Sequence, residues 1–142
     1  MALNTESGIS KKLATFIAKV ADSKLAKDIL ILELTDIEYA PSDYFVICTC
    51  ESTPQVEAVL WEINRKVKEL HDHNPKIEGI DAKEWVLMHY FDVVVHIFIK
   101  YARNFYQLEK LWGDAKFYQI SEAGRLRKMT DAEIKRLIKV IV

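Results

Sequence analysis

The chain has 142 residues, half of them apolar and 29% charged, which is the size and balance of one folded domain. Its formal net charge of −1 excludes a protein whose whole surface binds polyanions. No apolar run approaches the roughly 20 residues that a helix needs to cross a bilayer, and residues 1–7 lack the pattern of a secretion signal. We therefore expect a cytoplasmic protein without a membrane partner.

Charge is divided unevenly along the chain. Residues 103–142 carry nine Lys and Arg against five Asp and Glu, a net charge of +4. Residues 1–102 carry 11 Lys and Arg against 16 Asp and Glu, a net charge of −5. A basic C-terminal part on an acidic body is a weak indication of nucleic-acid binding. An ordinary solvated helix face would give the same pattern.

The first three predicted elements are one helix and two strands. Apolar residues at helical spacing predict an amphipathic helix over residues 9–20. The runs 28–34 and 44–48 are short and almost wholly apolar, which is typical of strands covered on both faces. Too few residues join these strands for a crossover helix, so we expect them to pair antiparallel.

Residues 52–55 form a strong start signal for a second long helix. Ser52 can cap the helix, and Gln55 can reach back to the cap amide. Pro54 stands in the first turn, where its missing N–H costs nothing. An apolar stripe then predicts that the helix continues to about residue 72.

Two further strands are predicted over residues 85–90 and 93–99. The pair Phe91-Asp92 between them indicates a tight hairpin. A short helical segment is expected over residues 105–112, before a glycine that suits a helix end.

A last helix is expected to begin after Thr130, because Glu133 stands three residues later and completes a capping box. Its apolar residues fall on one face, and its basic residues fall elsewhere. Together the elements predict the α+β fold class, as a mixed β-sheet of four to five strands flanked by helices.

Residues that could carry catalysis are sparse. Asp43 stands where nucleotidyltransferases place the first of two Mg²⁺-binding aspartates at i and i+2, but Phe45 takes the second position. Asp92 and His96 would share a strand face and could act as orienter and base, although a half-buried histidine in a structural role is commoner. We therefore expect no catalysis, no metal and no cofactor.

The two cysteines, Cys48 and Cys50, lie in one apolar run. On a strand they would share one face, yet two sulfurs alone cannot complete a zinc site. Buried, reduced thiols are the expected state.

Aromatic side chains gather in the predicted hairpin and just after it, interleaved with charged residues. Protein interfaces concentrate aromatics, because a ring removes much surface from water at little entropic cost. Packing between the sheet and the helices would explain the same residues, so both interpretations stay open. The interleaved charged residues are Glu84, Asp92, Arg103 and Glu109.

Four stretches of the chain carry short motifs whose order and spacing can be compared with those of known families. They are Ser42–Ile47, Ser52–Val56, Glu84–Phe98 and Arg103–Asp114. Together they resemble the Iojap, or ribosomal silencing factor, family from about residue 8 to residue 117. The match is specific, since short aromatic-rich motifs rarely coincide four times in register.

The resemblance implies a nucleotidyltransferase-like fold that has lost its catalytic carboxylates, in agreement with Phe45. It implies binding to the large ribosomal subunit through ribosomal protein L-fourteen, which would sterically block joining of the small subunit and repress translation. It also implies a homodimer when the protein is free. The alternative is a nucleotidyltransferase-like enzyme with a degenerate metal site at Asp43.

The resemblance places the partner-binding residues in the matched stretches. We expect Trp85 and Phe91 to anchor the partner, with polar contacts from Glu84, His89 and Asp92. Three further aromatic residues would either assist or only brace the sheet: Phe105, Tyr106 and Trp112. His89 stands where many relatives carry an acidic residue, so one charge contact would be replaced or become pH-sensitive.

The resemblance divides the chain into a ribosomal silencing factor domain, residues 1–117, and a basic C-terminal extension with a helix, residues 118–142. The family pattern says nothing about the extension. A contact between the extension and ribosomal RNA is a hypothesis. Deletion of residues 118–142 would contradict it if ribosome affinity and its salt dependence both stayed unchanged.

Overall fold

The computed structural model describes residues 2–141, with side chains from residue 8 to residue 138. Met1 and Val142, the outer ends of the predicted segments 1–117 and 118–142, lie outside the described residues. The helices are α1 (Ala2–Ser23), α2 (Thr53–His71), α3 (Lys100–Tyr106), α4 (Leu108–Leu111) and α5 (Asp131–Ile141). The strands are β1 (Lys27–Glu33), β2 (Tyr44–Cys50), β3 (Lys76–Glu78), β4 (Trp85–Tyr90), β5 (Val93–Ile99), β6 (Lys116–Ile120) and β7 (Leu126–Lys128).

Within residues 2–141, all seven strands form one mixed sheet in the order β3-β4-β5-β2-β1-β6-β7. The α+β class is confirmed, but the expected count of four to five strands is too low. Strands β3, β6 and β7 were not predicted, because they are short and lie toward the two edges of the sheet. The antiparallel pairing of β1 with β2 and the β4–β5 hairpin are confirmed. Only β2 and β5 pair in parallel among the described strands.

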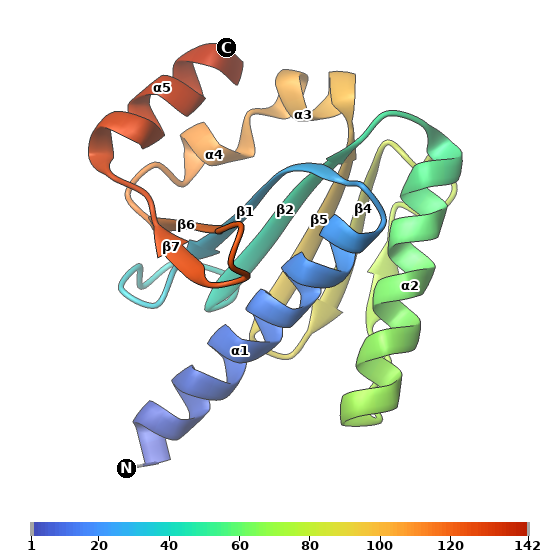
Figure 1. Cartoon of the computed structure of the whole chain (residues 1–142), viewed down its shortest axis with the longest axis horizontal. Helices are drawn as coiled ribbons and strands as arrows, with labels where there is room; N and C mark the ends of the chain where they lie inside the picture. Colours follow the sequence, from blue (N-terminus) through green and yellow to red (C-terminus); the bar gives the residue numbers. More distant parts are fainter. Residues whose placement is uncertain (1, 142) are drawn as a thin grey trace.

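One face of the sheet is covered by α1 and α2, which lie side by side in front of it in Figure 1. This layer encloses the larger core. Alternate residues of β2 point into it, including both cysteines, which are free and buried as expected. On β4 the residues that enter this core are Val86, Met88 and Tyr90.

The second face carries a smaller core over β1, β2 and β5. Phe45, Ile47 and Phe98 contribute to it from the sheet, and Ala102 and Leu108 contribute from α3 and α4. Apolar side chains of α5 pack against its margin. Along β4, the residues that face this side are only half-buried, so α3, α4 and α5 leave this part of the face accessible.

Helix ends follow the predicted capping chemistry with small differences. Ser52 Oγ accepts from the Gln55 amide at 3.3 Å, but Gln55 reaches back to the amide of Glu51 and not to that of Ser52. At α5, Thr130 and Glu133 form the expected reciprocal capping box. The predicted helical segment 105–112 is wrong in its bounds, because α3 begins directly after β5 and a break at residue 107 separates it from α4.

Strand β6 runs across residue 117, where the sequence suggested a division between the domain and the C-terminal extension. Residues 116–128 therefore complete one edge of the sheet, and the division itself stays a prediction. Among residues 2–141, no helix has both the length and the apolar character required to cross a membrane.

Candidate docking face

A ring-lined surface lies on the second face of the sheet, where β4 meets α3. Alternation along β4 turns Trp85, Leu87 and His89 to this side. From α3, Phe105 and Tyr106 extend the surface. We call these five residues the aromatic face.

Trp85 is the best-anchored member of the aromatic face. Its register partner on β5 is Phe98, and the two rings stack with centroids 4.9 Å apart. The Tyr106 ring lies 4.7 Å away on the helix side. The indole Nε1 donates a hydrogen bond of 3.0 Å to Nδ1 of His96. These contacts fix the orientation of a ring that is only partly buried.

His96 lies beneath Trp85 and is buried. Since its Nδ1 accepts the indole proton, the neutral ring carries its own proton on Nε2. Burial first, and then the charge of His89, lower the pKa of His96 to about 3. The partner of His96 is therefore Trp85, and the suggested pairing of His96 with Asp92 as base and orienter is wrong.

Ring contacts continue from the aromatic face across the second core. His96 meets Phe45 edge-on at 4.4 Å, and Phe45 meets Trp112 at 5.8 Å. Trp112 stacks on the exposed ring of Tyr39 at 5.5 Å. Trp112 therefore lies at the far end of this chain of rings, half-buried against the core.

Phe105 and Tyr106 are the most accessible rings of the aromatic face, with 76% and 49% of their surface exposed. They contact each other edge-on at 5.1 Å. Large rings left open to water are costly on a surface that has no partner, so this pair is the strongest local sign of a binding surface.

Phe91 and Asp92 lie at the opposite end of β4, in the hairpin turn. Phe91 is 80% exposed and stacks on His73 at 4.1 Å. The length of β4 separates Phe91 from Trp85 by six residues, or about 20 Å. The structure therefore divides the predicted aromatic partner-binding residues among three places: the aromatic face, the hairpin turn, and Trp112 at the far end of the chain of rings.

The polar residues of the prediction flank the aromatic face and the hairpin turn. His89 contacts Glu78 of β3 at 2.9 Å, and this hydrogen bond is the main cause that lowers the pKa of the Glu78 carboxyl. Glu84 is exposed beside Tyr101, whose pKa rises mainly because of its hydrogen bond to Glu84. The side chain of Asp92 is exposed, and its backbone carbonyl accepts from the amides of residues 43 and 44.

Two charged residues that the sequence placed among the interface aromatics are structural. Arg103 and Glu109 are 3% and 1% exposed, and their Nε and Oε1 atoms lie 2.6 Å apart. Arg103 also donates to Thr49 Oγ1 at 2.7 Å and to the carbonyl of Asp28. This pair ties α3 and α4 to the strands β1 and β2.

Of the two positions at which a nucleotidyltransferase would carry aspartates, only the first has a carboxylate, that of Asp43. Phe45 is buried at i+2, where a second aspartate would be required. Burial first, and then the nearby charge of Asp92, raise the pKa of Asp43. Among the described residues, no group of three His, Cys, Asp or Glu side chains has the arrangement of a metal site.

Sequence reasoning missed Leu87, Tyr101 and Tyr39, which all contribute accessible apolar surface near the rings. For Leu87 a signal was present, because it alternates with the core residues Val86 and Met88 on a strand. For Tyr39 and Tyr101 no local pattern distinguishes an exposed ring from a packed one.

Gly79 lies close to the backbone of Trp85, and Gly79→Ala should destabilise the fold by about 1–3 kcal/mol. Its φ of +81° lies in the left-handed region, and a Cβ there would overlap the carbonyl oxygen of Trp85. Urea unfolding followed by circular dichroism measures the change. Gly8→Ala is the matched control, because its Cβ meets open space on a helix, where alanine stabilises. Equal stability of both variants would contradict the expectation.

The fold and this face define a class, namely an α+β domain that offers a ring-rich surface on one face of a mixed sheet. Comparison with known proteins gives the family. The family described as "Ribosomal silencing factor during starvation" matches residues 8–137. The chain therefore belongs to the ribosomal silencing factor family, and the resemblance found in its motifs is confirmed.

Three similar proteins illustrate the match. Ribosomal silencing factor RsfS of Bacillus subtilis (strain 168) is 44% identical over 105 residues, 74% of this chain and 88% of that protein. The mouse (Mus musculus) protein named mitochondrial assembly of ribosomal large subunit protein 1 is 34% identical over 90 residues, 61% of this chain and 39% of that protein. A crystal structure from Chromobacterium violaceum superposes with a TM-score of 0.68 at 28% identity, covering 72% of this chain and 85% of that one.

Proposed function

We propose that this protein binds the large ribosomal subunit through the aromatic face, contacts ribosomal protein L-fourteen there, and sterically blocks joining of the small subunit. Translation falls as a result, without any chemical step. The observation that carries this proposal is the exposed pair Phe105 and Tyr106 beside the anchored ring of Trp85.

The character of the face supports a protein partner. Binding energy at interfaces is concentrated in a few aromatic anchors that are held rigidly and surrounded by polar groups. Trp85 has such an anchored position, and Glu84, His89 and Glu78 supply polar groups around it. The net charge of −5 over residues 1–102 complements the basic surface that is usual for ribosomal proteins.

Family membership supports a ribosomal partner. The Bacillus subtilis relative is named a ribosomal silencing factor, and the mouse relative is named for assembly of the ribosomal large subunit. We infer that the chain works where large subunits are found, in the cytoplasm. We also propose that the free protein forms a homodimer through the same exposed rings, so that dimerisation and subunit binding exclude each other.

Phe105→Ala should weaken binding to isolated large subunits by about 2 kcal/mol, which is roughly a 30-fold rise in Kd. The side chain is 76% exposed, so its truncation should leave the fold intact. Co-sedimentation with purified large subunits measures the affinity. Trp61→Ala is the control, because this ring is also exposed but lies on α2, on the other side of the sheet.

Excess small subunits separate occlusion from simple attachment. If the protein blocks joining, small subunits should displace it from large subunits, and Phe105→Ala should restore joining. Equal binding by Phe105→Ala and Trp61→Ala would contradict the placement of the site. Simultaneous binding of the protein and the small subunit would contradict the mechanism.

The proposed contact between residues 118–142 and ribosomal RNA requires a different test from deletion. Residues 118–128 include most of β6 and all of β7, which are paired strands of the sheet. Their removal would damage the fold, so point substitutions have to replace the deletion.

A further inference from the structure

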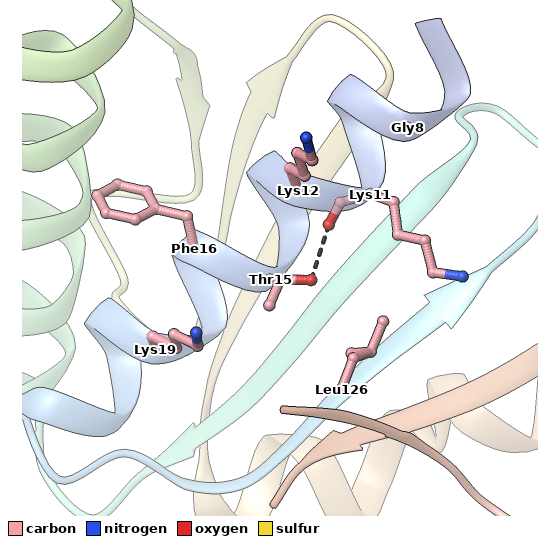
Figure 2. A pocket seen from close by; sticks show the side chains of 7 residues that line it. All are labelled: Gly8, Lys11, Lys12, Thr15, Phe16, Lys19 and Leu126. Atoms are coloured by element: carbon pink, nitrogen blue, oxygen red, sulfur yellow. Dashed lines mark hydrogen bonds between the residues drawn. The ribbon is translucent and has the colours of Figure 1, made fainter. Parts of the chain in front are cut away.

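A basic groove lies far from the aromatic face, between α1 and the β6–β7 hairpin. Figure 2 shows three lysines, Lys11, Lys12 and Lys19, projecting from α1 around it, with Leu126 of β7 on the facing wall. The groove encloses about 490 Å³. None of its described lining residues carries a carboxylate.

The three lysines differ in whether neighbouring groups already compensate their charge. Lys11 Nζ lies 3.4 Å from a Glu33 oxygen and 4.6 Å from the centre of the Tyr118 ring. Lys12 and Lys19 are exposed, and neither forms an ion pair within the described part of the chain. Two free ammonium groups therefore border the groove, two helical turns or about 10 Å apart along α1.

A fourth basic residue, Lys128, lies near the groove on β7. Lys128 stands two residues after Leu126 on β7 and therefore shares its face of the sheet. Its register partner is Tyr118, whose hydroxyl contacts Lys11. Arg127 points the other way and is bound by Glu133 of α5. Lys128 therefore lies close to the groove lysines of α1, although the two segments are far apart in the sequence.

The groove continues over α1 into a second hollow of about 470 Å³, which shares Phe16 and Lys19 with the first. Lys66 of α2 lines this hollow. Its one carboxylate, Glu62, is already engaged by Arg65 at 2.7 Å and by Lys24 at 3.8 Å. The half-buried ring of Phe16 lies between the two hollows.

We propose that this groove binds the phosphate backbone of RNA. Lysines act as point charges for phosphate, and proteins that track a strand combine such charges with a ring on which a base can pack. The choice of RNA among polyanions rests on the proposed function, because RNA is the polyanion that a ribosome-bound protein meets.

The two surfaces can be occupied together. Helix α1 covers the sheet face opposite the aromatic face, and β7 lies at the other end of the strand order from β4. A protein partner on the aromatic face therefore leaves the basic groove open. One domain would then hold a ribosomal protein on one side and RNA on the other.

The test compares Lys12→Gln/Lys19→Gln with the control Lys27→Gln/Lys68→Gln, which removes the same charge from exposed positions elsewhere. The control lysines form only surface pairs, with Glu51 and Asp72. The probe is a fluorescent single-stranded RNA of 20 uridines (about 20 nucleotides suffice to span one domain), titrated at several salt concentrations. The groove variant should bind on the order of 20-fold more weakly than wild type at 0.1 M salt, and its salt slope should fall by about 1.4.

One further variant and two further probes make the result decisive. Phe105→Ala should keep full affinity for the RNA probe while it loses large-subunit binding, so the groove and the aromatic face can fail separately. Equal RNA affinity of the groove variant and the control would overturn the proposal. So would absence of RNA binding by the wild type, or tighter binding to polyglutamate or to phosphatidylglycerol vesicles than to RNA.

Discussion

Arg103→Ala should lower the free energy of unfolding by about 3–5 kcal/mol, because it leaves the Glu109 carboxylate buried without its counter-charge. Glu109 is 1% exposed and has Arg103 as its ion-pair partner among the described residues. The substitution also removes the donor to Thr49 Oγ1. Urea unfolding monitored by far-ultraviolet circular dichroism gives the change directly.

The double variant Arg103→Met/Glu109→Met is the matched control. It removes both charges and fills similar volume with apolar atoms, so its loss of stability should be much smaller than that of Arg103→Ala. If Arg103→Ala cost less than 1 kcal/mol, the pair would not be the link that ties α3 and α4 to the sheet.

Lowering the pH from 6.5 toward 3 should destabilise the protein by up to about 1.4 kcal/mol per pH unit through His96 alone. In the folded state, burial and then the charge of His89 lower the pKa of His96 to about 3. In the unfolded chain the ring titrates near its ordinary pKa of 6.5. Between these values the unfolded chain binds the extra proton, so stability is present above pH 6.5 and is lost as the pH falls.

His96→Asn isolates this contribution. Its amide oxygen can accept the Trp85 indole hydrogen bond, but it does not titrate. Carboxyls with a lowered pKa, such as Glu78 and Glu133, add acid sensitivity to both proteins and cancel in the comparison. The slope of unfolding free energy against pH between 6 and 4.5 should be distinctly smaller in the variant. Identical slopes would show that His96 protonates freely in the folded state.

Strong local patterns allowed β4 and β5 to be predicted residue by residue, while the predicted bounds of β1 and β2 (28–34 and 44–48) differ from the observed ones by one or two residues. The bounds of β4 and β5 agree with the expectation, since continuous apolar runs and a two-residue turn leave little freedom. Strands β3 and β7 have three residues each. Three residues, charged-apolar-charged in β3 and apolar-charged-charged in β7, are too few to show periodicity, and only pairing with a neighbour makes them a strand.

The candidate site was harder to predict, because burial depends on contacts distant in sequence. Arg103 stands in the same aromatic-rich segment as Phe105, yet its partner Thr49 is 54 residues away. Nothing local distinguishes the buried arginine from the exposed ring two positions later. The basic groove was hidden for the same reason, because Lys12 and Leu126 become neighbours only when β6 joins β1.

The pairing of β1 with β6 has a consequence for synthesis. Strand β1 ends at residue 33, but the partner of its second edge begins at residue 116. While the chain is being synthesised, the backbone N–H and C=O groups on that edge of β1 have no strand to pair with until almost the whole protein has left the ribosome. Such an unpaired edge is a template for aggregation. Premature termination before residue 116 should therefore yield fragments that aggregate. We expect a chaperone to bind the nascent chain until β6 has been synthesised.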